Sequence, residues 1–463
     1  MSNKIIHIKD YICERCFFLI TNYTNDKVNN IDKKELLNLS CSNKCNFCFG
    51  LLDLNIYPNI IKKIKNDLNE YEHNDFKISI NFSIIFDLIH LYWRNILKND
   101  KELNIKNCNE FDPNFLRIFI KQLIIPMISQ NIHENFNIKS NLEIQIFFEF
   151  EQKIYDIINE MFIIMGKNIK IKQNDNSKAN KGLYQYIKEI PASLLNVCIE
   201  KYNINNITNN INKNEKDILL INYNILHDSI FIKGNYNKYT REIGQSPWEI
   251  NGIKVCPSSV EEEMEKTILN YFISNKLTMS AGGREDKDVR MLGNGRPFIL
   301  EIFNPKNNIK NIKNLEKEIN KNSKYIKVND LDKCDREYIE IIKQAELNKM
   351  KLYTSVVWID KKINDNDLNI INKINNLKII QKTPLRVLHR RTLTDREKII
   401  HKMECEKIND HFLILDILAS AGTYIKEFIH SDLGRTEPNL KSLLKSKCDI
   451  LQLDVKELKL LNK

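Results

Sequence analysis

Glycine is scarce in this sequence. The chain has 12 glycines in 463 residues, yet Gly282, Gly283, Gly293 and Gly295 fall within one short stretch. Glycine readily adopts backbone conformations with positive φ and lets a ligand or another strand approach closely. This concentration therefore marks residues 280–301 as a stretch that requires unusual backbone geometry or close approach.

Long apolar runs are absent. Nowhere do about 18 apolar residues follow one another, the length that a membrane-spanning helix needs. Lys9 and Asp10 precede any long apolar run, which argues against a secretory signal. The 11 cysteines are odd in number and mostly scattered, which fits a reducing compartment better than a disulfide framework. We expect a soluble intracellular protein of the nucleus or cytoplasm, with no membrane partner.

Acidic residues are outnumbered by basic ones. The chain has 70 Lys and Arg against 60 Asp and Glu, a formal net charge of +10. Basic side chains release counterions from phosphates, so this excess is consistent with a polyanionic partner, although a general Asn and Lys bias would also produce it. Hydrophobic residues make up 42% of the chain, a globular composition, and its length predicts two or three domains.

The amino-terminal region contains two C-x2-C pairs. They are Cys13 with Cys16, and Cys45 with Cys48. Each pair can place two thiolates on one turn, and four thiolates give Zn²⁺ the closed tetrahedral shell of a structural site, with no open position for catalysis. Cys41 lies near the second pair, and it either replaces one ligand or remains a free thiol. The sequence predicts a zinc-binding module in residues 1–75.

The glycine-rich stretch also carries charged side chains. They are Arg284, Glu285, Asp286, Asp288 and Arg290. A strand-like apolar run follows at residues 297–303, so the charged loop is expected at the edge of a sheet. Loops on rigid scaffolds often carry binding and catalytic groups. We interpret this stretch as a site, in preference to a solvated turn whose charges pair with one another.

Gly283-Arg284-Glu285-Asp286 resembles the G-R-x-D motif around the catalytic aspartate of pseudouridine synthases. Its continuation through Asp-Val-Arg and Gly-Arg-Pro-Phe resembles the tRNA pseudouridine synthase ten family, and further blocks extend the resemblance over most of the chain after about Lys233. The resemblance implies an isomerase without an organic cofactor. Its substrate would be uridine 54, uridine 55 or both in the T-arm of tRNA, and Asp286 would be its nucleophile.

The same resemblance implies two partners for Asp286. Lys426 ends a G-T-Y-I-K string that is similar to the motif whose basic residue pairs with the catalytic aspartate. Tyr353 lies on a strand-like segment where the family has a tyrosine that stacks on uracil, and core packing is its alternative role. Asp286 either attacks C1′ or removes the 2′ proton to give a glycal, and the sequence leaves both routes open. Asp288 is expected to brace the loop.

Contacts with tRNA are expected from several basic blocks. Residues 233–248 interleave basic and aromatic side chains and resemble the G-x-Y-x-K-x-x-R…Q-x-P-W segment of the family. Residues 381–391 carry a dense group of basic side chains that suits a phosphate clamp. The predicted substrate-binding residues are Arg284, Arg290, Lys238, Arg241, Arg386, His389, Arg390, Arg391 and Arg435.

The resemblance implies a monomer of mixed α+β and α/β class with three parts. The zinc module of residues 1–75 precedes a THUMP-like accessory RNA-binding domain of residues 76–245, whose assignment rests on position alone. The pseudouridine synthase domain of residues 246–463 is expected to be built on a mixed, largely antiparallel sheet. Residues 77–82 alternate as a strand, residues 113–128 read as a helix, and residues 141–150 fit either.

The competing functional class is a non-catalytic RNA-binding factor that retains the same fold. The sequence has neither a P-loop nor a glycine-rich cofactor motif, which argues against a thiolation or methylation enzyme with a similar accessory domain.

Overall fold

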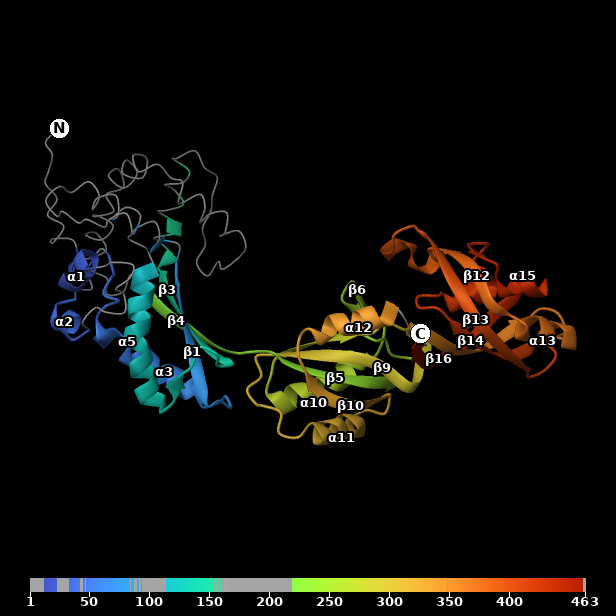
Figure 1. Ribbon diagram of the computed structural model, residues 1–463, viewed down its shortest axis with the longest axis horizontal. Coiled ribbons are helices and arrows are strands. Elements are labelled where there is room, and N and C mark those ends of the chain that lie inside the picture. The colour runs from blue at the N-terminus through green and yellow to red at the C-terminus, as the bar shows by residue number, and fades with distance from the viewer. Residues whose placement is uncertain are drawn as a thin grey trace. The chain divides into compact units, whose positions relative to one another are not determined.

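The computed structural model describes residues 12–22, 33–41, 45, 47–83, 114–152, 219–347 and 349–460, with a few single residues between 85 and 163. The chain forms two compact units, residues 1–228 and 229–463 (Figure 1). Each unit has its own hydrophobic core. The second unit begins earlier than residue 246, the predicted start of its domain, because strand β5 (Ile230–Lys238) pairs with other strands of its sheet. A boundary at residue 75 stays a prediction.

The first unit combines short helices with a sheet whose strand order is β2-β1-β3-β4. Its described elements are α1 (Glu14–Asn22), α2 (Lys33–Asn38), η3 (Leu54–Ile56), α3 (Pro58–Leu68), β1 (Asp75–Phe82), α5 (Asn114–Ile132), β2 (Asn135–Phe136), β3 (Leu142–Phe150) and β4 (Leu219–His227). The expected strand at 77–82 and helix at 113–128 are confirmed by β1 and α5. The ambiguous segment 141–150 forms β3, whose side chains largely alternate between buried and half-buried positions.

The second unit is built on a ten-stranded sheet with the order β10-β5-β9-β16-β11-β14-β13-β12-β15, and β8 pairs with β9 beside this path. Its strands are β5, β8 (Lys276–Ala281), β9 (Val289–Phe303), β10 (Ile326–Cys334), β11 (Lys349–Ile359), β12 (Asn375–Lys382), β13 (Asp395–Lys407), β14 (Phe412–Ala419), β15 (Thr436–Glu437) and β16 (Cys448–Leu460), with the separate hairpin β6 (Glu249–Ile250) and β7 (Ile253–Lys254). Among the described strands of this sheet, β9 and β16 form the one parallel pair. The prediction of a mixed, largely antiparallel sheet is confirmed.

Helices cover this sheet. They are α10 (Val260–Phe272), α11 (Ile312–Asn322), α12 (Tyr338–Leu347), α13 (Asp365–Asn372), η5 (Leu385–Arg390), α14 (Ile425–His430) and α15 (Leu440–Leu444). Helix α10 packs against α11, and both lie on the half of the sheet that contains β5 and β10 (Figure 1). The Ser259 hydroxyl accepts a hydrogen bond from the Glu262 amide, as expected for the cap of this helix. None of the described helices is both long and apolar enough to cross a bilayer.

Strand β9 changes its pairing partner at two glycines. Its first residues pair in parallel with β16, whereas residues 296–302 pair antiparallel with β5. Gly293 and Gly295 lie between these parts with φ of 57° and 79°, and a Cβ on Gly293 would lie 2.1 Å from the Lys456 carbonyl oxygen. The expected need for glycine is confirmed here. The expected loop is shorter than residues 280–301, because regular pairing resumes at Val289.

Candidate active site and metal centre

The loop of residues 282–288 connects β8 to β9. Lys238 of β5 binds the backbone of this loop through its ammonium group. The Lys238 ammonium donates hydrogen bonds to the carbonyl oxygens of Ile243 at 3.0 Å, Asp286 at 3.1 Å and Lys287 at 2.8 Å. Its side chain is fully buried, and this burial lowers the pKa of Lys238. A phosphate contact, as expected for Lys238, does not fit this burial. Lys238 instead fixes the backbone that carries Asp286.

A buried ion pair supports the start of the same loop. Glu285 accepts a hydrogen bond of 2.8 Å from Arg296 Nε, and both side chains are fully enclosed. The Tyr236 hydroxyl donates to Glu285 at 2.9 Å, and the Gln245 amide donates to that hydroxyl. Arg296 also donates to the Gly282 carbonyl at 2.7 Å. Because each charge has a partner, this network can hold the loop without a buried uncompensated ion.

The Asp286 carboxylate lies between two cations. Its Oδ2 is 2.9 Å from Arg386 Nη1 and 3.6 Å from Lys426 Nζ. Arg386 comes from η5, and Lys426 from the first turn of α14. The Asp286 side chain is 34% exposed, so it stays accessible from solvent. The two cations hold the Asp286 carboxylate in place, as a positioned nucleophile or base requires.

Asp288 competes with Asp286 for Lys426. The Lys426 ammonium lies 2.7 Å from Asp288 Oδ2 and 2.8 Å from Oδ1, closer than to Asp286. Partial burial raises the pKa of Asp288, but the hydrogen bonds and charge of Lys426 outweigh it, and the net pKa lies below the ordinary value. The Asp288 carbonyl also accepts a 2.8 Å hydrogen bond from Arg241. These contacts agree with a bracing role for Asp288.

Arg386 has a second carboxylate partner that sequence reasoning missed. Its Nε donates to Glu427 Oε1 at 2.7 Å, while Nη1 contacts Asp286. Glu427 directly follows Lys426 and is 2% exposed. Burial alone lowers the pKa of Arg386, but the charges of Glu427 and Asp286 outweigh it and raise the pKa above its ordinary value. Arg386 was expected on the tRNA backbone, and here its guanidinium binds two carboxylates of the site.

Arg241 and Arg290 converge on Asp454 of β16. Arg290 forms a bidentate pair with Asp454 at 2.9 and 2.6 Å, and Arg241 approaches the same carboxylate at 2.6 Å. Partial burial raises the pKa of Asp454, but the hydrogen bonds from Arg290 and the charges of both arginines lower it below the ordinary value. In the parallel pairing of β9 with β16, Arg290 lies opposite Asp454 itself. Both arginines were expected to contact tRNA. In this structure they instead bind Asp454 and so connect the end of the 282–288 loop and the start of β9 to β16.

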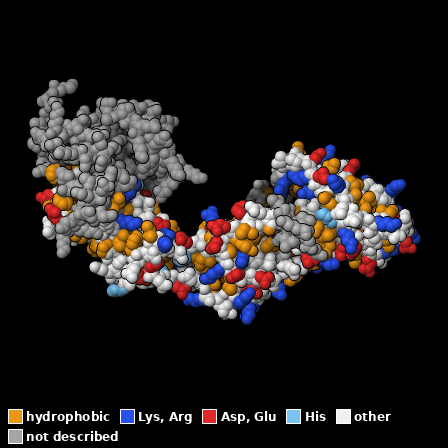
Figure 2. Space-filling model, in the orientation of Figure 1, with side chains coloured by type: hydrophobic (Ala, Val, Ile, Leu, Met, Phe, Trp, Pro, Cys, Tyr) orange, Lys and Arg blue, Asp and Glu red, His pale blue; other side chains and the backbone are white. Residues whose placement is uncertain are grey.

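The other predicted tRNA-binding residues divide into two groups. Arg284, His389 and Arg391 are exposed, and Arg390 ends η5. Arg435 instead donates to the Thr383 carbonyl at 2.7 and 3.2 Å. On the face in Figure 2, basic and acidic side chains are interspersed over the second unit. The exposed basic residues near the loop are therefore better candidates for RNA contact than Lys238, Arg241, Arg290 or Arg435.

Tyr353 lies in the interior of the sheet on β11. Its side chain is 8% exposed and belongs to the hydrophobic core of the second unit. Tyr353 is opposite Val455 of β16, and Val455 is opposite Met291 of β9. Two strand spacings, about 10 Å, thus separate the backbone of Tyr353 from the strand that leaves the Asp286 loop. Core packing and a place beside the site are both compatible with this position.

The sequence offered little indication of the residues that hold the 282–288 loop in place. Arg296 belongs to the Gly-Arg-Pro-Phe string that carried the family resemblance, and Glu427 adjoins the expected Lys426, but neither received a role. Nothing in the order of residues indicates which basic side chain is buried. Only the pairing of β5 with β9 brings Lys238 and Tyr236 beneath the loop.

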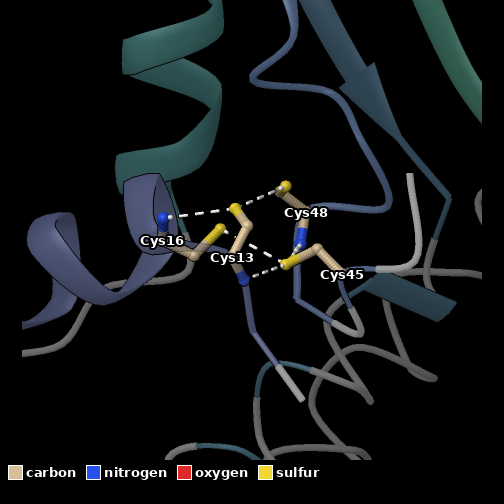
Figure 3. Close-up of side chains that lie close together, drawn as sticks. All are labelled: Cys13, Cys16, Cys45 and Cys48. Atoms are coloured by element: carbon tan, nitrogen blue, oxygen red, sulfur yellow. Dashed lines mark hydrogen bonds between the residues drawn. The ribbon is translucent and has the colours of Figure 1, made fainter. Parts of the chain in front are cut away.

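The four cysteines of the two C-x2-C pairs come together in the first unit (Figure 3). Their sulfur atoms all lie within 4.8 Å of one another, with 3.8 Å between Cys13 and Cys48 and 3.7 Å between Cys16 and Cys45. A tetrahedral Zn²⁺ with Zn–S bonds of about 2.3 Å requires sulfurs about 3.8 Å apart. All four are buried, so the donor set fits a closed structural site.

Cys41 lies at the edge of this cluster. Its sulfur is 3.8 Å from both Cys13 and Cys48, but it does not belong to the mutually close set. Arg15, between the first two cysteines, donates to the carbonyl oxygens of Leu39 at 2.8 Å and Leu37 at 3.0 Å, and also to that of Leu52. These bonds join the two cysteine pairs through the backbone. The geometry favours Cys13, Cys16, Cys45 and Cys48 as the ligands.

Comparison with known proteins identifies the relatives of this chain. Residues 231–459 match the family model described as "Pus10, C-terminal". The chain is 34% identical over 419 residues to the human protein named "tRNA pseudouridine synthase Pus10", covering 89% of this chain and 78% of the human one. The Xenopus laevis protein of that name is 33% identical over 417 residues, covering 89% of this chain and 79% of the relative. The Methanocaldococcus jannaschii protein is 37% identical over 239 residues, 49% of this chain and 52% of that protein.

Solved structures give a weaker likeness. A chain in the crystal structure of a Cbf5-Nop10-Gar1 complex is 15% identical, with 48% of each chain covered and a TM-score of 0.28. A likeness this low carries no argument about the site. The human and Xenopus laevis relatives, by contrast, align with most of the chain. Together with the family model, they show that the chain belongs to the tRNA pseudouridine synthase Pus10 family.

Proposed function

We propose that the chain isomerises uridine to pseudouridine in tRNA, at position 54, position 55 or both, with Asp286 as the catalytic carboxylate. The observation that carries this proposal is the accessible Asp286 carboxylate held between Arg386 at 2.9 Å and Lys426 at 3.6 Å. Asp286 lies in a loop whose backbone is held by two buried interactions, the hydrogen bonds of Lys238 and the ion pair between Glu285 and Arg296. The names of the human and Xenopus relatives support tRNA as the substrate.

The reaction rearranges one nucleotide without a net change in atoms. The N1–C1′ bond breaks, the uracil turns, and a C5–C1′ bond forms, while the C5 proton is lost and N1 gains a proton. Asp286 either attacks C1′ or removes the 2′ proton, and both routes begin with an ionised carboxylate. Because the base is paired or stacked in folded RNA, the target uridine must turn out of its stack before Asp286 can reach the sugar.

The neighbours of Asp286 receive distinct roles in this proposal. Lys426 and Arg386 orient the Asp286 carboxylate. Tyr353 stacks on the uracil and assists loss of the C5 proton, with packing in the core as the alternative. Exposed Arg284, His389 and Arg391 meet the phosphates of the T-arm.

The amino-terminal region serves this site as a support for RNA binding. The four cysteines hold a structural Zn²⁺, which would cross-link helix α1 to the segment that carries Cys45 and Cys48. We assign the part of the first unit from residue 76 to residue 228 to a THUMP-like accessory domain that binds the tRNA. The protein acts as a monomer in this proposal.

The test is to map pseudouridine on an unmodified tRNA transcript incubated with the purified full-length chain. Parallel transcripts carry cytidine in place of uridine 54, uridine 55 or both. We expect conversion of the natural transcript and none of the doubly substituted one, and the single substitutions name the position. Conversion elsewhere in the tRNA, with the T-arm untouched, would refute the proposed position. Tight tRNA binding without any conversion would favour the non-catalytic RNA-binding alternative.

A further inference from the structure

We infer that Glu427 is a positioning residue of the active site, which holds the Arg386 guanidinium against Asp286. The inference rests on the proposed pseudouridine synthase activity and adds a residue for which the sequence suggested no role. Glu427 acts on Asp286 indirectly, because it binds Arg386, which in turn contacts Asp286.

The first argument is the geometry of the guanidinium. Arg386 Nε donates to Glu427 Oε1 at 2.7 Å, and Nη1 lies 2.9 Å from Asp286 Oδ2. These donors are fixed relative to each other in one rigid plane. Holding Nε in place therefore fixes both the direction and the distance at which Nη1 meets Asp286. A lysine in place of Arg386 could not transmit orientation in this way.

The second argument is that Arg386 is the nearer cation of Asp286. Lys426 lies 3.6 Å from Asp286 but 2.7 Å from Asp288, so its ammonium is drawn toward the neighbouring acid. Among the ion pairs of the described residues, Arg386 contacts Asp286 and Glu427 but not Asp288, and it approaches Asp286 more closely than Lys426 does. The orientation of the Asp286 carboxylate therefore depends chiefly on Arg386, and through it on Glu427.

The third argument is the contrast in exposure between the two partners. Glu427 is buried on α14, whereas the Arg386 side chain is partly exposed on the short helix η5. A long, partly solvated arginine samples many rotamers unless a fixed partner holds it. Glu427 is such a partner, since its Oε1 binds Arg386, while the buried Oε2 accepts no hydrogen bond from the part of the chain that is described. The buried carboxylate thus has Arg386 as its compensating charge.

The test compares three variants of the full-length chain in single-turnover pseudouridine formation, together with tRNA affinity. Glu427→Leu removes the acceptor, Glu427→Asp keeps the charge but shortens the side chain, and Glu427→Gln keeps the length and the acceptor. For Glu427→Leu we expect the rate constant to fall about 10- to 100-fold, since a displacement near 1 Å costs about that much, with tRNA affinity nearly unchanged. The rate constant of Glu427→Gln should exceed that of Glu427→Asp, because the position of the Arg386 guanidinium depends on a side chain long enough to accept its hydrogen bond, rather than on the negative charge.

Two controls isolate the effect. Asp367 of α13 is also a buried carboxylate with a single lysine partner, Lys361 at 2.6 Å, in the same unit. Asp367→Asn should reduce thermal stability without changing the rate. In an Arg386→Met background, the further change Glu427→Leu should have no effect on the rate, because Glu427 acts through Arg386.

The outcomes separate this inference from the proposed function. If the wild-type chain forms no pseudouridine in any tRNA, the proposed function fails. If the wild-type chain is active and Glu427→Leu matches it, or if Glu427→Asp exceeds Glu427→Gln, Glu427 is not a positioning residue. A loss of tRNA affinity at an unchanged rate constant would also overturn the inference. If Glu427→Leu does not fold, the order of the Gln and Asp variants decides the question.

Discussion

Asp286 has two cationic neighbours, and the nearer one is a residue that the sequence placed on the tRNA backbone. Lys426 was expected beside Asp286 and lies there at 3.6 Å, but Asp288 holds it more closely. Arg386 makes the 2.9 Å contact instead. At the scale of single residues, the candidate site therefore contains three carboxylates and two cations, with Arg386 joining Asp286 to the buried Glu427.

Lys238 provides a test of positioning against phosphate binding. Lys238→Met removes the ammonium that binds three backbone carbonyls, so we expect slower single-turnover conversion, by about 10- to 100-fold, with tRNA affinity and its salt dependence little changed. If Lys238 instead met a phosphate, affinity would fall and the salt dependence would become shallower by about one charge. Lys233→Met, at a partly exposed position on the same strand, is the matched control and should change neither.

Asp454 provides a test by pH. Its folded pKa lies below the ordinary value, so its ion pairs with Arg290 and Arg241 contribute stability above pH ~4, and this contribution is lost as pH falls through the folded pKa. The Asp454 side chain is only 11% exposed, so Asp454→Asn should lower the free energy of unfolding by about 1–3 kcal/mol at neutral pH. Urea unfolding followed by circular dichroism measures this difference.

The same variant should differ less from wild type in acid. As pH approaches or falls below the folded pKa, the wild-type carboxyl becomes protonated and the two proteins lose the same ion pairs. A penalty that is equal at neutral pH and at pH ~3 would show that Asp454 stabilises by packing alone. Asp332→Asn, at an exposed position with a long 3.9 Å contact to Lys233, is the control and should be neutral at both.

At the scale of elements, the cysteine cluster brings the first pair, at helix α1, together with Cys45 and Cys48. We expect one Zn²⁺ per purified chain by metal analysis. Cys16→Ser should abolish it, because four thiolates form the closed shell, whereas Cys41→Ser should retain it, because the Cys41 sulfur lies outside the mutually close set. If Cys41→Ser lost the zinc and Cys16→Ser kept it, Cys41 would be the fourth ligand and Cys16 the free thiol.

Elements also show where sequence reasoning succeeds. Ser259 caps α10 and acids fill its first turn, so local chemistry alone predicts that helix start. Strand β1 follows the alternating apolar pattern that the sequence predicts for residues 77–82. Strand β9 was partly missed, because Arg290 and the glycines at 293 and 295 interrupt its apolar pattern, and because its pairing with β16 joins residues distant in sequence. Periodicity carries no information about that parallel pair.

At the scale of the whole molecule, the second unit begins with β5, which the sequence had assigned to the preceding domain. A strand of nine residues fits either domain by composition, and only its pairing with β9 and β10 decides. The motif residues Asp286 and Lys426 were found because local strings carry them. No role was predicted for Arg296 or Glu427, and the burial of Lys238 argues against its predicted phosphate contact. Burial depends on contacts between distant strands and helices, which local strings do not reveal.

The central claim is that the Asp286 carboxylate performs the isomerisation, and one measurement tests it most directly. Single-turnover pseudouridine formation on an unmodified tRNA transcript should be compared between the wild-type chain and Asp286→Asn, with tRNA affinity measured for both. Asparagine keeps an oxygen that can accept from Arg386 but lacks the negative charge needed for attack or proton removal. The account predicts conversion by the wild type, none by the variant, and equal affinity. Conversion by Asp286→Asn at the wild-type rate would contradict it.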